Sequence, residues 1–166
     1  LGHRKIGFAG FSESFSWVRE RYAGYLDALY RRGLAVERED TVSMDIDVLE
    51  GRSSVKSGDI DSILSRVNNG VSAWMCVNDF VAYPLSRALL SRGVKIPEDI
   101  SLTSFDNIGA ETLDCPPVTG VVVPDKVLGS MALRRLLYKL DNPDEARCDI
   151  RIDSRFCEGQ STAPVC

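Results

Sequence analysis

Short apolar runs alternate with longer amphipathic segments over residues 1–106. Four apolar runs predict buried strands at residues 5–10, 41–44, 72–77 and 100–105. Between them, apolar positions recur with a helical period and predict helices over residues 18–29, 59–67 and 79–91, while residues 45–57 are expected to be a loop or an irregular helix. Because strands alternate with helices without hairpin turns, we expect an α/β fold, a Rossmann-like parallel sheet with helices on both faces.

The pattern changes after Pro116 and Pro117. Residues 118–123 are rich in β-branched side chains and predict an extended segment that Pro124 ends. The segment 126–140 predicts an amphipathic helix, and residues 149–156 are expected to form a final strand. The apolar positions of that helix are Val127, Leu128, Met131, Leu136 and Leu140.

Composition and charge narrow the possible functions. The 166 residues are 44% hydrophobic and can bury a core without metal or disulfide bonds. The net charge is −4, so we expect no direct contact with nucleic acid or with an anionic membrane. The five cysteines form no CxxC pair, which favours reduced thiols in the cytoplasm over a zinc site or a disulfide framework. The chain opens at Leu1 without an initiator methionine, so we expect a piece of a longer protein.

Three loops follow strands of the predicted sheet. Ligands bind beyond the carboxyl ends of the strands in an open parallel sheet, so these loops are the candidate site. They offer a guanidinium, carboxylates, side-chain amides and aromatic faces, a set that suits a polyol or a nucleobase-like ligand. The side chains concerned are Phe15, Trp17, Arg21, Asn78, Asp79, Asp106 and Asn107.

Each of these residues also has a purely structural interpretation. Asn78 and Asp79 could only cap a helix, since both residue types favour that position. Trp17 could be an anchor in the core, and Asp106 could simply end a strand.

The sequence offers little for catalysis. The only histidine, His3, precedes the first strand and is therefore expected at the edge opposite the loops. No phosphate-binding glycine motif follows a strand, and no pair of carboxylates stands out. We therefore expect a binding protein, without a metal or cofactor, and not an enzyme.

A series of motifs, in order, resembles the lactose-repressor (LacI/GalR) family of bacterial transcription regulators over essentially the whole chain. The motifs are His3-Arg4-Lys5-Ile6-Gly7-Phe8, Arg21-Tyr22-Ala23-Gly24-Tyr25, Asn78-Asp79-Phe80-Val81-Ala82, Ile96-Pro97-Glu98-Asp99-Ile100-Ser101, Phe105-Asp106-Asn107, Pro116-Pro117-Val118-Thr119, Leu128-Gly129 and Gln160-Ser161-Thr162-Ala163-Pro164.

The resemblance implies an effector-binding domain of two Rossmann-like subdomains hinged around a cleft. It assigns residues 1–123 to the C-terminal subdomain, 124–153 to a segment that normally belongs to the N-terminal subdomain, and 154–166 to a tail that crosses back. The partners it implies are a small polar effector (a sugar or a nucleobase-like molecule), operator DNA through a headpiece outside this chain, and a second copy in a homodimer.

The same resemblance assigns roles to individual residues. Arg21 would be the cleft arginine and Asp106 the acid that hydrogen-bonds the effector, while Tyr83 lies on a helix that often contributes to the subunit interface. The other matching effector-binding positions are Asn78, Asp79, Phe15 and Trp17.

Four positions depart from the family pattern. Pro84 replaces a residue that is usually glycine, and Ser104 stands where glycine commonly precedes the Phe-Asp pair. Gly120 takes a customary threonine, and Gly159 falls in a segment that usually carries arginine. These departures leave details of the cleft and the hinge open.

A periplasmic sugar-binding protein of a transport system is the alternative function, since it shares this fold. Such a protein would be exported and normally lacks several free cysteines. A helix-turn-helix upstream of this segment would indicate a regulator, and a signal peptide would indicate transport.

Overall fold

The computed structural model describes residues 1–106 and 117–165 and contains one sheet of six strands. The strands are β1 (Ile6–Phe11), β2 (Thr41–Ser43), β3 (Ala73–Cys76), β4 (Ser101–Asp106), β5 (Thr119–Val122) and β6 (Arg155–Cys157). Their order is β2-β1-β3-β4-β5-β6, and β1 to β5 pair in parallel. The predicted α/β fold is confirmed, with one addition, because β6 pairs antiparallel to β5.

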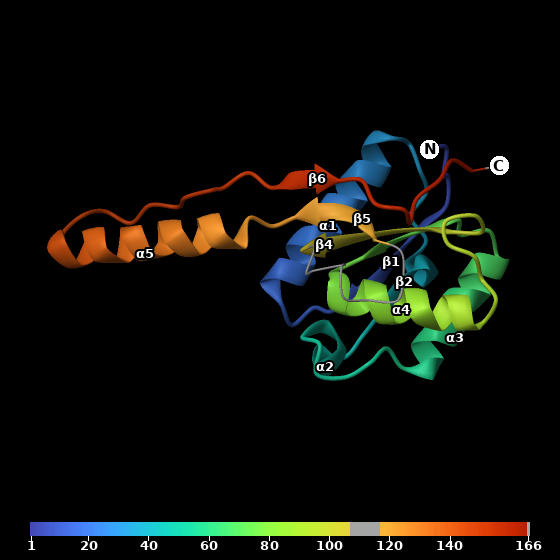
Figure 1. Ribbon diagram of the computed structural model, residues 1–166. Coiled ribbons are helices and arrows are strands. Elements are labelled where there is room, and N and C mark those ends of the chain that lie inside the picture. The colour runs from blue at the N-terminus through green and yellow to red at the C-terminus, as the bar shows by residue number, and fades with distance from the viewer. Residues whose placement is uncertain (107–116, 166) are drawn as a thin grey trace.

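Helices cover both faces of the sheet, as the alternating pattern predicted. They are α1 (Ser16–Arg31), α2 (Ile46–Leu49), α3 (Ser57–Asn68), α4 (Asp79–Ser91) and α5 (Asp125–Asp141), with a 3₁₀ turn, η1 (Arg38–Asp40). The helix α1 lies on one face, and α2, α3 and α4 lie on the other (Figure 1). The chain passes from β1 to β2 in one direction across the sheet, and from β2 to β3 and on to β4 in the opposite direction. Because crossovers between parallel strands are right-handed, the helices of these two directions lie on opposite faces.

The core forms where the apolar runs of the sheet meet the apolar stripes of the helices. Phe8 and Val18 are fully buried between β1 and α1, and Leu85 and Leu89 of α4 are fully buried on the other face. The interior therefore consists of the side chains that the two periodicities indicated.

Local sequence signals set the ends of the elements. Gly33 follows α1 with φ +62°, a left-handed conformation that glycine adopts without steric cost, and it closes the helix as predicted. The predicted helix over 59–67 begins two residues earlier, at Ser57, so Asp59 lies inside its first turn. Residues 45–57 contain the short helix α2, in agreement with an irregular helix.

The prediction of a strand over residues 149–156 was wrong in extent. Only residues 155–157 pair in the sheet, and residues 149–154 run beside α5 without forming a strand (Figure 1). An alternating pattern shows that a segment can be extended, but pairing also requires a strand edge within reach. Here β5 offers that edge only from Gly120 to Val122.

The helix α5 projects away from the sheet, and the returning chain runs back along it (Figure 1). Leu128, Met131 and Ala132 of α5 line a hollow with Ile150 and Ile152 of the returning segment. No residue of α5 is buried. Its exposed large apolar side chains are Val127, Leu128, Leu133, Leu136, Leu137, Tyr138 and Leu140.

The tail beyond β6 fastens the amino ends of the central strands. The Ser161 hydroxyl donates to the carbonyl of Leu102 at 2.6 Å and accepts from the amide of Thr119 at 2.8 Å. The amide of Val165 donates to the carbonyl of Leu1 at 2.9 Å, which places the two ends of the chain side by side. Within the residues described, no helix is long and apolar enough to span a bilayer.

Candidate functional site

Arg21 brings together the carboxyl ends of the central strands. It lies on α1, and its Nη1 donates to the carbonyl of Val77, just beyond β3, at 2.8 Å. Its Nη2 donates to Oδ1 of Asp106, the last residue of β4, at 2.8 Å. The two side chains are 18% and 23% exposed, so the ion pair is largely shielded yet open to a ligand on one side. The structure therefore unites two of the predicted effector residues.

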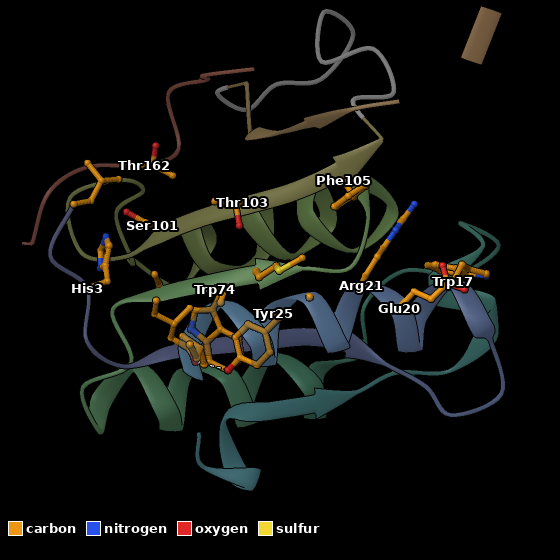
Figure 2. Close-up of a pocket in the computed structure, with 17 residues that line it drawn as sticks. His3, Trp17, Glu20, Arg21, Tyr25, Trp74, Ser101, Thr103, Phe105 and Thr162 are labelled. Carbon is orange, nitrogen blue, oxygen red and sulfur yellow. Dashed lines mark hydrogen bonds between the residues drawn. The ribbon is translucent and has the colours of Figure 1, made fainter. Parts of the chain in front are cut away.

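Two aromatic rings flank the guanidinium of Arg21. Its Cζ lies 5.0 Å from the ring centroid of Trp17 and 4.4 Å from that of Phe105. Phe15 continues the cluster, with its ring centroid 6.0 Å from that of Trp17. Figure 2 shows Arg21 rising from α1 toward Phe105, with Trp17 on its other side. Phe15 and Trp17 were predicted at this site, whereas Phe105 was not.

The position of Phe105 next to Asp106 could have revealed it. Ser101, Thr103 and Phe105 are every second residue of β4 and line the same groove, so Phe105 points to the face that α1 occupies. The sequence pattern placed Phe105 in a buried strand and predicted no role for it in binding, because a single aromatic residue in such a strand is most simply a core residue.

The backbone of Asp106 has an unusual conformation. Its φ is +96°, the only positive value at a non-glycine residue among those the structure describes. Aspartate tolerates positive φ better than most residue types, yet such a conformation is strained and persists only where its surroundings hold it. The hydrogen bonds to Arg21 help to hold the Asp106 carboxylate at the mouth of the site.

Asn78 and Asp79 follow Val77 at the start of α4 and are buried, with 3% and 5% exposure. The Asn78 side chain accepts from the amide of Val81 at 3.1 Å, which caps α4, and donates to the carbonyl of Leu49 at 2.7 Å. The Ser104 hydroxyl donates to Oδ1 of Asp79 at 2.5 Å. In this conformation both side chains have internal partners, and neither lines the groove beside Arg21. Asn107 lies outside the described residues.

The family departures at positions 104 and 120 occupy neighbouring places. Ser104 and Gly120 are register partners on β4 and β5. A Cβ atom on Gly120 would collide with the backbone carbonyl of Ser104, so the two strands approach closely here. Pro84 lies inside α4, next to Tyr83, whose side chain is buried in this chain. Gly159 is required by a close approach like that at Gly120, since a Cβ atom on Gly159 would collide with the backbone carbonyl of Pro117.

A groove of about 700 Å³ leads from the Arg21 cluster along the face of the sheet next to α1 (Figure 2). Arg21 and Phe105 lie at one end, Met75 and Thr103 line its floor, and His3 lies at the other end. His3 bonds to Ser72 Oγ at 2.9 Å and to the carbonyl of Ala163 at 3.0 Å, which confirms its expected place at the amino edge of the sheet. Among the described residues, no group of three His, Cys, Asp or Glu side chains could hold a metal ion.

Comparison with known proteins identifies the family. The periplasmic binding protein-like domain matches residues 1–162. This chain belongs to that family. The ribose operon repressor of Haemophilus influenzae is 28% identical over 144 residues, which cover 87% of this chain and 42% of that protein.

Solved structures of the same family agree with the fold. The transcription regulator CcpA of Lactococcus lactis superimposes with a TM-score of 0.80 at 26% identity, covering 98% of this chain and 57% of that one. A sugar-binding LacI-family regulator from Escherichia coli, complexed with phosphate, has a TM-score of 0.78 at 26% identity, with 98% and 56% coverage. The expected resemblance to LacI/GalR regulators is confirmed. The chain spans less than half the length of the curated relative above.

Proposed function

We propose that this chain is the effector-sensing part of a bacterial transcription regulator that binds a small polar metabolite. The observation that carries the proposal is the Arg21–Asp106 pair at the carboxyl edge of the sheet, flanked by Trp17 and Phe105. The relatives described above are repressors and regulators, which favours this function over transport and over catalysis. The site would lie in the cytoplasm, as in a protein that acts on DNA.

The chemistry of the pair favours a hydroxyl-bearing effector such as a sugar. The guanidinium offers donors and the carboxylate offers acceptors, side by side. A hydroxyl group can accept from the first and donate to the second at the same time. A phosphate or carboxylate group brings only acceptors and would be repelled by Asp106. A sugar without an anionic group at this end therefore fits best.

The remaining assignments follow from the family. We propose that residues 1–123 form one subdomain, that 124–153 pack on the other subdomain, and that 154–166 cross back. The exposed apolar side chains of α5 support this division, because surfaces of that kind are normally covered in the intact protein. Operator binding would require a DNA-binding headpiece. The helix α4 would lie near a homodimer interface, which the buried Tyr83 would support from within this chain.

A thermal-shift screen of the full-length regulator tests the proposal. The panel would contain neutral sugars, their phosphate esters and nucleobases. A ligand that binds only the native state raises the unfolding midpoint, and at 100 times its Kd it adds about 2.7 kcal/mol to stability. We expect one or a few neutral sugars to raise the midpoint. A response to nucleobases alone would contradict the preferred ligand class.

A further inference from the structure

The Arg21 guanidinium contacts two aromatic rings in addition to the residues that accept its hydrogen bonds. Trp17 comes from the first turn of α1, and Phe105 comes from β4, so the two rings reach the guanidinium from separate elements. Val77 and Asp106 accept two of its N–H groups from the ends of two neighbouring strands. Two ring contacts together with these hydrogen bonds restrict both the tilt and the rotation of this planar group.

We propose that Trp17 and Phe105 are positioning residues that fix the plane of the Arg21 guanidinium before an effector arrives. This inference rests on the proposed role of Arg21 in effector binding. Arginine has many rotamers, and a free side chain loses that freedom when it binds a ligand. Aromatic rings attract a guanidinium through their negative faces and stack on its planar surface. With the two rings in place, Arg21 loses this conformational freedom when the protein folds and not when the effector binds.

The same geometry determines how an effector meets Arg21. A guanidinium has five N–H donors, and Nη1 and Nη2 already make three hydrogen bonds, one to the carbonyl of Val77 and two to the carboxylate of Asp106. The N–H bonds lie in the plane of the guanidinium, so the other donors point along the edge of that plane. An effector would accept hydrogen bonds at this edge, next to the carboxylate of Asp106.

Rotation of the Arg21 guanidinium about its Nε–Cζ bond, which exchanges Nη1 with Nη2, measures this restraint directly. Isotope-labelled protein gives the rotation rate by NMR, without any ligand. Trp17→Leu and Phe105→Leu each remove one ring while keeping an apolar side chain, whereas Trp17→Phe and Phe105→Tyr keep a ring in place. Phe156→Leu is the matched control, because Phe156 is exposed on β6.

We expect each leucine variant to accelerate the rotation by about 2- to 5-fold, the factor that corresponds to one exposed cation–π contact. In the ring-retaining variants and in Phe156→Leu, the Arg21 guanidinium should rotate at the wild-type rate. A general loss of packing would instead accelerate the rotation in these variants too. Unchanged rotation in both leucine variants would overturn the inference and would leave Val77 and Asp106 as the sole restraints. If Phe105→Leu does not fold, the two Trp17 variants, at a half-buried helix end, decide the matter.

The sugar screen decides the proposed function separately, because it measures stabilisation by ligand and not the motion of Arg21. Fast rotation in the leucine variants together with a failed screen would leave the positioning of Arg21 intact and reject the ligand class. Rotation at the wild-type rate in both leucine variants, together with a successful screen, would reject the positioning of Arg21 and support the ligand class.

Discussion

Nη2 of Arg21 lies 2.8 Å from Oδ1 of Asp106, although the two residues are 85 positions apart in the sequence. Arg21 is on α1, the helix that follows β1, and Asp106 ends β4. The order β1-β3-β4 places one strand between the two, and Arg21 reaches across it while donating to Val77. The sheet topology therefore brings the two residues together, at the edge where the carboxyl ends of the parallel strands lie.

This chain alone should not bind DNA specifically. Its net charge is −4, and specific binding depends on many phosphate contacts from Lys and Arg. Fluorescence anisotropy with labelled DNA from the protein's own promoter checks this expectation, with a scrambled duplex as the control. Tight, sequence-dependent binding by these 166 residues would contradict it.

Asp40→Asn should stabilise the fold at neutral pH, and the gain should shrink as the pH falls. Burial raises the pKa of the Asp40 carboxyl above its ordinary value, Lys5 at 3.9 Å opposes this, and Glu37 adds to it. Because the folded state holds this proton more tightly than the unfolded state, its contribution is present at low pH. It is lost as the pH rises through the raised pKa.

Asparagine stays neutral throughout, so the variant escapes that loss. Thermal unfolding at several pH values between 4 and 8 measures the difference between the two proteins. Glu98→Gln is the control, since Glu98 is exposed and is not among the charges that shift the pKa of Asp40. A wild-type protein that is the more stable of the two at pH 8 would show that the contact with Lys5 outweighs the cost of burial.

The helix α5 should be the least protected regular element of the isolated chain. None of its residues is buried, whereas full burial of a single leucine is worth about 1.5–3 kcal/mol. Hydrogen exchange should therefore be faster over residues 126–140 than over β1, β3 and β4. Exchange as slow as that of the strands, in a strictly monomeric species, would mean that α5 is stable by itself.

The exposed leucines of α5 should also make the isolated chain associate. Apolar patches of this kind commonly end in contact with another chain, and we expect a dimer. Light scattering over a range of concentrations measures this directly. Leu136→Gln combined with Leu140→Gln should shift the population toward the monomer, while Leu1→Gln, at an exposed site on the body, should not.

Most of the fold could be predicted from the sequence, because periodicity and helix-ending residues act locally. The strands around Phe8 and Leu102 and the end of α1 at Gly33 follow from the pattern of side chains within a few positions. The last strand could not be placed, since β6 depends on the short edge that β5 leaves open. Pairing partners are a property of the whole sheet and not of the segment.

The candidate site was predictable in part for the same reason. Arg21 and Asp106 were found because the strand ends of a parallel sheet share one edge. The sequence could not show that the Asn78 side chain bonds to Leu49 and Val81, or that Phe105 flanks Arg21. Both facts depend on distances between elements that the sequence separates.

Calorimetric titration of Arg21→Ala and Asp106→Ala with the sugar identified by the screen tests the central claim most directly. Each substitution in the full-length protein should weaken binding by about 1.5–3 kcal/mol, or about 10- to 150-fold, the usual worth of a hydrogen bond that involves a charged group. Arg31→Ala, which removes an exposed ion pair with Asp27 at the far end of α1, should bind as the wild type does. Wild-type affinity in both Arg21→Ala and Asp106→Ala would show that the effector binds elsewhere.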